Sequence, residues 1–150
     1  MTITPAHTRS GLGVQSLFRG LATLTVALTL ASAGCAPLPL VCTAAQDVQP
    51  EQLHGRWTVQ LADSPLAWAL QLGPHPEHRG SLRGELTQGL LRYSVVADLA
   101  NGEFTMEESR DGQRIAATWL GDVATGSCGR LVLGERLSPG QAPQTFRMQP

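Results

Sequence analysis

The sequence predicts an all-β protein, a small antiparallel up-and-down barrel of about eight strands that follows an N-terminal signal segment. From residue 54 onward, apolar and polar residues alternate with a period of two, and turn residues recur at roughly ten-residue spacing. The chain of 150 residues suits one domain, and its 16 glycines and 10 prolines favour turns over helices. Closure into a barrel removes the exposed edges of such a sheet. A two-sheet sandwich is the alternative.

Residues 1–34 have the pattern of a secretory signal peptide. Arg9 and Arg19 form its basic part, and no acidic residue occurs before Asp47. The apolar run over residues 21–31 is shorter than the about 20 residues that cross a bilayer, and it is typical of a signal peptide. We therefore predict that this segment is removed during export.

The residues after the apolar run leave two processing routes open. Ala33-Gly34-Cys35 is similar to the end of a bacterial lipobox, in which the cysteine becomes the lipidated first residue, although Ser32 stands where such signals usually have leucine. Cleavage after Ala31-Ser32-Ala33 would instead release a soluble periplasmic protein.

The cysteine count favours lipid on Cys35. Cys42 and Cys128 then remain as an even pair, which predicts a disulfide in an oxidising compartment. We expect a membrane anchor at Cys35, a location in the cell envelope facing the periplasm, and a proline-rich linker over residues 35–52 that leads to the barrel domain at 53–150.

The first strands of the domain follow from inward-facing apolar residues. The first strand presents Trp57, Val59 and Leu61, and the second presents Trp68, Leu70 and Leu72, with one helical turn over residues 66–72 as the alternative. Residues 73–78 form a loop, because two prolines do not suit a central ladder. A third strand covers residues 79–87.

The later strands are separated by clear turn signals. Asn101-Gly102 predicts a type I′ hairpin turn, and Asp111-Gly112 predicts a second turn. Apolar residues alternate with polar or small ones in these strands: Leu91, Tyr93, Val95 and Ala97, then Phe104 and Met106, which face inward, then Ile115, Ala117 and Trp119. A strand over 128–136 carries Leu131 and Leu133, and a strand over 144–149 carries Phe146 and Met148.

One short motif carries a family resemblance. Gly55-x-Trp57 at the start of the first strand is similar to the G-x-W opening of calycins, and the length, export and disulfide potential resemble the bacterial metalloprotease inhibitors. The resemblance implies a periplasmic eight-stranded barrel that inserts free N-terminal residues into a protease cleft. A lipidated Cys35 and a proline-rich linker depart from that mode, so no functional residue is carried over.

Few residues suggest chemistry. His75-x-x-His78 with Glu77 lies in a proline-flanked loop without a third strong ligand nearby in sequence, so we predict no metal site. Glu107, Glu108 and Asp111 lie at a hairpin shoulder, where we expect a solvated edge beside Arg110 and Arg114. Alternation directs Glu107 outward; the alternative is that Glu108 points inward, where a buried acid would mark a functional site. We predict no catalytic residues, no cofactor and, because the domain is mildly acidic, no nucleic-acid partner.

These observations favour a non-enzymatic envelope lipoprotein that acts as a binding module for a protein, such as a protease, or for a small apolar ligand. Trp57, Trp68 and Tyr93 are the candidate ligand-facing residues. A continuous pocket lined by them would favour a small ligand, whereas a solid interior would favour a protein partner. A structural or assembly accessory of the envelope without a small ligand is the alternative.

Overall fold

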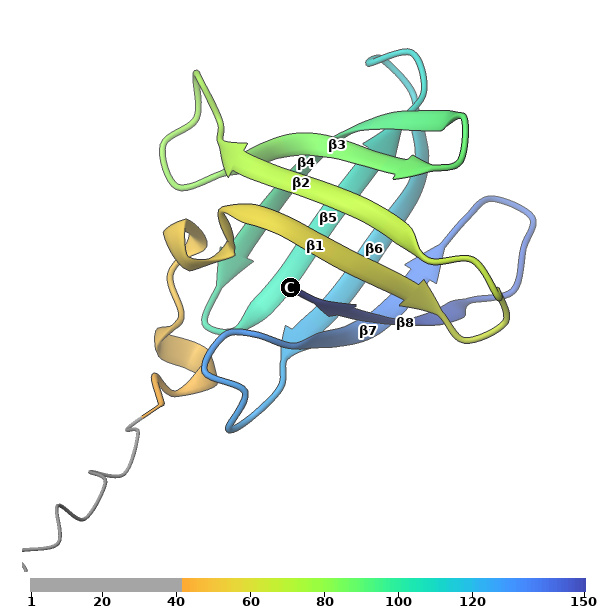
Figure 1. Ribbon diagram of the computed structural model, residues 1–150. Coiled ribbons are helices and arrows are strands. Elements are labelled where there is room, and N and C mark those ends of the chain that lie inside the picture. The colour runs from red at the N-terminus through yellow and green to blue at the C-terminus, as the bar shows by residue number, and fades with distance from the viewer. Residues whose placement is uncertain (1–41) are drawn as a thin grey trace, which may run out of the picture. The chain divides into compact units, whose positions relative to one another are not determined.

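The computed structural model describes residues 42–150 and folds as a closed antiparallel barrel of eight strands (Figure 1). Each strand pairs with the next along the chain, and β1 pairs with β8 to close the barrel. The strands are β1 (Gly55–Leu61), β2 (Trp68–Pro74), β3 (Leu82–Gln88), β4 (Leu91–Ala100), β5 (Glu103–Ser109), β6 (Ile115–Val123), β7 (Val132–Leu137) and β8 (Gln144–Gln149). The predicted barrel is confirmed, rather than the sandwich.

The two-residue alternation of the sequence produces the core. In β4, Tyr93, Val95, Ala97 and Leu99 are buried and the residues between them are exposed. Residues 68–74 form strand β2 rather than a helical turn. The turn between β4 and β5 is also as predicted, because Asn101 and Gly102 both have positive φ, 53° and 85°, as a type I′ turn requires.

Gly121 allows close packing on the side of the barrel that β5 to β8 form. Gly121 in β6 faces inward, opposite Phe104 on one side and Gly134 on the other. A Cβ atom at Gly121 would lie 2.7 Å from the carbonyl oxygen of Leu133 and 3.0 Å from Cζ of Phe146. Glycine therefore lets the neighbouring strand and the Phe146 ring approach closely.

Strand β7 differs from its prediction. It begins at Val132 rather than near Cys128, because Cys128 and Gly129 have φ of 56° and 75°, which belong to a turn and not to a strand. The inward residues of β7 are consequently Val132, Gly134 and Arg136, and Leu133 lies on the outer surface. An arginine therefore points into the barrel at position 136.

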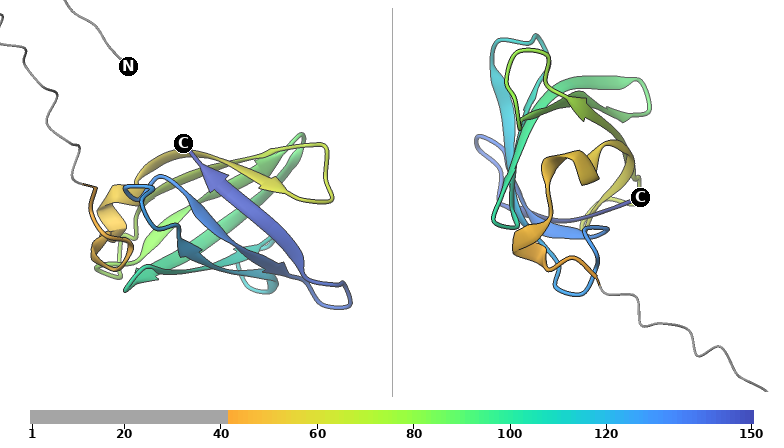
Figure 2. Two further views of the ribbon diagram at one scale, coloured as in Figure 1. Left: turned by 90° about the horizontal axis from the view of Figure 1, so that it is seen from below. Right: turned by 90° about the vertical axis from the view of Figure 1, so that its left-hand side faces the viewer.

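Two 3-10 helices, η1 (Ala45–Asp47) and η2 (Pro50–Leu53), cover one end of the barrel (Figure 2). Val48 between them and Leu53 at the end of η2 are buried in the core cluster. Residues 42–52 of the predicted linker thus pack against the barrel. We call this the capped end, and the other the uncapped end.

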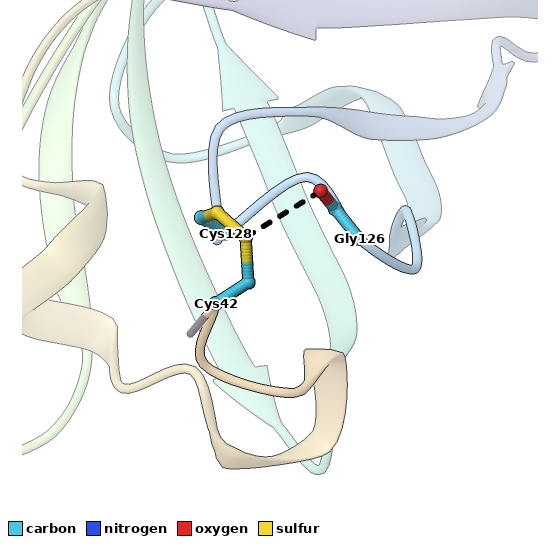
Figure 3. Close-up of a disulfide and its surroundings, with 3 residues drawn as sticks. All are labelled: Cys42, Gly126 and Cys128. Atoms are coloured by element: carbon cyan, nitrogen blue, oxygen red, sulfur yellow. Dashed lines mark hydrogen bonds between the residues drawn. A yellow bond between two sulfur atoms is a disulfide. The ribbon is translucent and has the colours of Figure 1, made fainter. Parts of the chain in front are cut away.

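A disulfide ties the start of the described chain to the capped end. Cys42 is bonded to Cys128 in the β6–β7 loop, with 4.6 Å between the Cα atoms and a sequence separation of 86 (Figure 3). The Sγ atom of Cys42 also lies 3.7 Å from the carbonyl oxygen of Gly126. The predicted pairing of Cys42 with Cys128 is confirmed.

Candidate functional site

The three candidate ligand-facing residues are divided between the two ends of the barrel. Trp57 lies at the capped end, where its Nε1 donates a hydrogen bond of 2.8 Å to the carbonyl oxygen of Leu53 in η2. Trp68 and Tyr93 lie together near the uncapped end, with 5.6 Å between their ring centroids. A single pocket lined by all three residues is therefore not formed.

Large aromatic rings form an inner layer near the uncapped end. Trp68 meets Trp119 edge-on at 6.5 Å between centroids, and Trp119 meets Phe146 edge-on at 5.2 Å. The rings of Trp68 and Trp119 are both buried, as is Tyr93. These contacts are the tilted and edge-to-face arrangements that aromatic quadrupoles favour, so the layer is a packed floor and not a channel.

A buried ion pair lies within this layer. Glu108 of β5 is fully buried, and its two carboxylate oxygens accept from three donors. Arg136 donates to Oε1 through NH2 at 2.5 Å and to Oε2 through Nε at 3.3 Å, while Trp119 Nε1 donates to Oε2 at 2.9 Å. A buried carboxylate needs this degree of pairing, because an unpaired buried charge costs several kcal/mol.

The guanidinium of Arg136 is held between aromatic rings. Its central carbon lies 5.4 Å from the ring centroid of Trp119 and 5.9 Å from that of Trp68, which are cation–π distances. Its NH1 donates to Oε1 of Gln144 on β8 at 3.3 Å. The side chain is only 12% exposed, so its position is fixed from four strands.

A second arginine lies at the edge of the inner layer. Arg110, in the loop between β5 and β6, is exposed and donates through NH2 to the hydroxyl oxygen of Tyr93 at 3.0 Å. Its guanidinium carbon lies 5.3 Å from the centroid of the same ring. Arg110 is thus oriented by a ring that is itself packed against Trp68.

The loop that carries Arg110 is shaped by its own aspartate. Oδ1 of Asp111 accepts from the backbone N–H groups of Gln113 and Arg114, both at 2.9 Å, and from the hydroxyl of Ser109 at 3.2 Å. The N–H of Arg114 and then that of Gln113 contribute most to holding the pKa of Asp111 below its ordinary value. The carboxylate therefore stabilises the conformation of its own loop.

Exposed apolar side chains lie along part of the uncapped end. We define the apolar rim as Leu66 in the β1–β2 loop, Leu90 and Leu91 at the β3–β4 turn, and Ile115 after the β5–β6 loop. Leu66 is 63% exposed, Ile115 is 53% exposed, and Leu90 is fully exposed. The carbonyl oxygen of Leu66 accepts from Nε2 of Gln88 at 3.2 Å, which holds the β1–β2 loop beside the end of β3.

The histidine motif lies at the capped end. His54, His75 and His78 line a surface cavity of about 440 Å³ between η2 and the β2–β3 loop. Nδ1 of His75 accepts from the backbone N–H groups of Glu77 and His78, both at 3.1 Å, so a neutral His75 carries its proton on Nε2. Within residues 42–150, no group of three or more His, Cys, Asp or Glu side chains has a metal-binding arrangement.

Sequence reasoning identified some of these residues and missed others. Glu108 was expected at a solvated hairpin edge, and this was wrong: the side chain is fully buried, as in the inward alternative that alternation allowed. Arg136, Arg110 and Gln144 were missed as partners of the aromatic residues. Arg136 lies two residues after Gly134 on the same strand, so the two residues face the same side. This direction becomes apparent only when the bounds of β7 are known. Cys35, the predicted lipidation site, lies outside the described residues.

Comparisons with known proteins supply no family for the chain. No helix in the described part is long and apolar enough to span a membrane. No protein-family model matches this sequence, and a search of curated proteins finds no significant match.

Proposed function

We propose that this chain is a non-enzymatic, lipid-anchored protein of the bacterial cell envelope that binds a protein partner through the uncapped end of its barrel. The observation that carries the proposal is the apolar rim. Four of the seven exposed large apolar residues in residues 42–150 belong to it, and none of the seven lies on a loop of the capped end. Exposed apolar residues that cluster on loops are typical of interaction surfaces.

The interior supports a protein partner over a small apolar ligand. Trp119, Phe104 and Met106 are completely or almost completely buried, and Trp119 packs edge-on against both Trp68 and Phe146. A drug-sized ligand needs a cavity of roughly 300 Å³ or more. Side chains occupy the space in which such a ligand would lie.

The proposed anchor points the uncapped end away from the membrane. Six residues lie between Cys35 and Cys42, so the two Cα atoms are about 25 Å apart at most. Cys42 is bonded to the β6–β7 loop at the capped end. A lipid on Cys35 would therefore hold the capped end near the bilayer, which leaves the apolar rim available to a partner in the periplasm.

The anchor is tested by the intact mass of the protein extracted from membranes. A mass that begins at Cys35 and includes a diacylglycerol group is expected. A lipid-free mass that begins at Gly34 would refute the anchor and favour a soluble periplasmic protein.

The contact surface is tested by placing a photo-crosslinking residue at Leu90 in the full chain, inside living cells. A discrete adduct with an envelope protein is expected at this position. The matched control is Thr125, which is exposed in the β6–β7 loop at the capped end. Equal adducts at positions 90 and 125, or none at position 90, would refute the proposal.

A further inference from the structure

The β2–β3 loop, residues 75–81, is held closed by a side chain as well as by its backbone. Two backbone hydrogen bonds form the base of the loop: the N–H of His75 donates to the carbonyl oxygen of Ser81 at 3.0 Å, and the N–H of Ser81 donates to that of His78 at 3.2 Å. Nearer the tip, the backbone N–H groups of Glu77 and His78 have Nδ1 of His75 as their only acceptor among the described residues. The conformation of the tip therefore depends on one imidazole nitrogen.

That nitrogen accepts hydrogen bonds only while His75 is neutral. In an imidazolium both ring nitrogens carry a proton, so Nδ1 becomes a donor. Protonation of His75 therefore sets a third N–H against those of Glu77 and His78 and removes both bonds of the tip at once. Histidine is the side chain whose ordinary titration falls between about pH 5 and pH 8. The closed loop is thus the conformation that belongs to the neutral side chain.

The other two histidines of the capped-end cavity do not hold the loop. His54 and His78 line the same cavity of about 440 Å³, but within residues 42–150 no backbone N–H donates to either of their rings. The ring of His78 lies 4.5 Å from that of His75 between centroids. Two imidazolium rings at this separation repel each other, so protonation of His78 acts in the same direction as protonation of His75.

Charged side chains border His75 on two sides of the loop. Those that line the capped-end cavity are Glu51 on η2 and Glu77 and Arg79 on the loop itself. Those that line a second surface cavity, of about 200 Å³, are Arg83, Glu107, Arg114 and the buried Glu108. No carboxylate of the described chain forms an ion pair with His75 in the closed loop. The neutral ring therefore has no competing partner, whereas a released imidazolium has carboxylates within both cavities.

We propose that the β2–β3 loop is a pH-dependent switch at the capped end, closed by neutral His75 and released by protonated His75. Release separates the tip of the loop from the imidazole and widens the cavity between the loop and η2. The bonds with Ser81 persist, because they join backbone atoms alone, so the loop opens without unfolding β2 or β3. The switch goes beyond the partner site at the uncapped end and does not depend on it.

The amide signal of Glu77 tests the switch in the processed, ¹⁵N-labelled protein. Between about pH 8 and pH 5, this signal should shift with the midpoint of the His75 ring. His75→Asn supplies an acceptor oxygen that does not titrate in this range, so the shift should disappear. The matched control is His78→Asn, which removes the neighbouring ring and should leave the shift in place. A Glu77 amide that does not shift in the natural protein, or that shifts equally in His75→Asn, would overturn the proposal.

Cleavage by trypsin at one fixed pH separates opening of the loop from the titration itself. The chain must leave the closed loop before trypsin can cut after Arg79, so the rate follows the population of the open loop. His75→Leu removes the acceptor at every pH. At about pH 8 it should be cut about tenfold faster than the natural protein, which is the factor expected for one net hydrogen bond. His75→Asn should be cut at the natural rate, and equal rates for all three proteins would contradict the switch.

Discussion

The two ends of this barrel are closed by different means. At the capped end the chain covers its own core, with Leu53 and Val48 as buried residues and a disulfide from Cys42 as a covalent tie. At the uncapped end, aromatic rings and a buried ion pair seal the core from within, and the loops remain free. A closed interior therefore does not require a covered surface, because an end that is packed from within can still expose apolar residues.

The largest loss of stability is expected when the buried ion pair between Glu108 and Arg136 is broken. Arg136→Met leaves the carboxylate of Glu108 buried with one indole donor, which should lower the free energy of unfolding by about 4 kcal/mol. Urea denaturation measures this loss. Adding Glu108→Met removes the stranded charge, so the double variant should be more stable than Arg136→Met alone. Equal stability of the two variants would show that the ion pair does not act as a unit.

The next largest loss of stability is expected when the Cys42–Cys128 disulfide at the capped end is removed. Replacing both Cys42 and Cys128 with alanine should cost about 3 kcal/mol, because the disulfide restricts a long loop of the unfolded chain. Thermal denaturation measures the change. A reductant should lower the Tm of the natural protein in the same way and leave the double variant unaffected; a reductant effect on the double variant would contradict this assignment.

A pair of tryptophan variants compares the two ends directly. Trp57→Phe removes the indole donor to the carbonyl oxygen of Leu53, whereas Trp68→Phe removes an indole that donates to no described residue. Trp57→Phe should therefore cost about 1 kcal/mol more than Trp68→Phe. Chemical denaturation measures both, and limited proteolysis within residues 42–53 should accelerate only for Trp57→Phe. A greater loss for Trp68→Phe would show that its N–H has an acceptor.

The smallest effect on stability is expected from Asp111, in the loop that carries Arg110. Backbone N–H groups lower the pKa of Asp111 in the folded protein, so its charge stabilises the fold above the ordinary value of 3.8. This contribution is lost as pH falls through the lower, folded pKa. The stability difference between the natural protein and Asp111→Asn should thus be larger at neutral pH than in acid. A difference that grows on acidification would contradict the lowered pKa.

The sequence was most informative where local rules decide the structure. The Asn101-Gly102 turn, the alternation in β4 and the pairing of two remaining cysteines each follow from neighbouring residues or from a count. These features could be predicted because they do not depend on distant strands.

The candidate site depends on such distant strands. Arg136 meets Glu108 from 28 residues away, and nothing in the local pattern of β7 distinguishes an inward arginine from a solvated one. The short helices η1 and η2 lack the length that makes a periodic pattern visible. The separation of Trp57 from Trp68 was in principle accessible, since both residues lie near the starts of antiparallel strands, and such starts lie at opposite ends.

The pairing of β1 with β8 has a consequence for the synthesis of the protein. The first strand cannot complete its ladder until the last residues, Gln144–Gln149, have arrived, so the fold has high contact order and its final closure is slow. A chain that emerges N-terminus first therefore presents two unpaired sheet edges until its synthesis is complete. A premature stop codon that removes only the last strand would leave those edges permanently open, and the product would be a substrate for aggregation and for proteolysis rather than a shortened barrel.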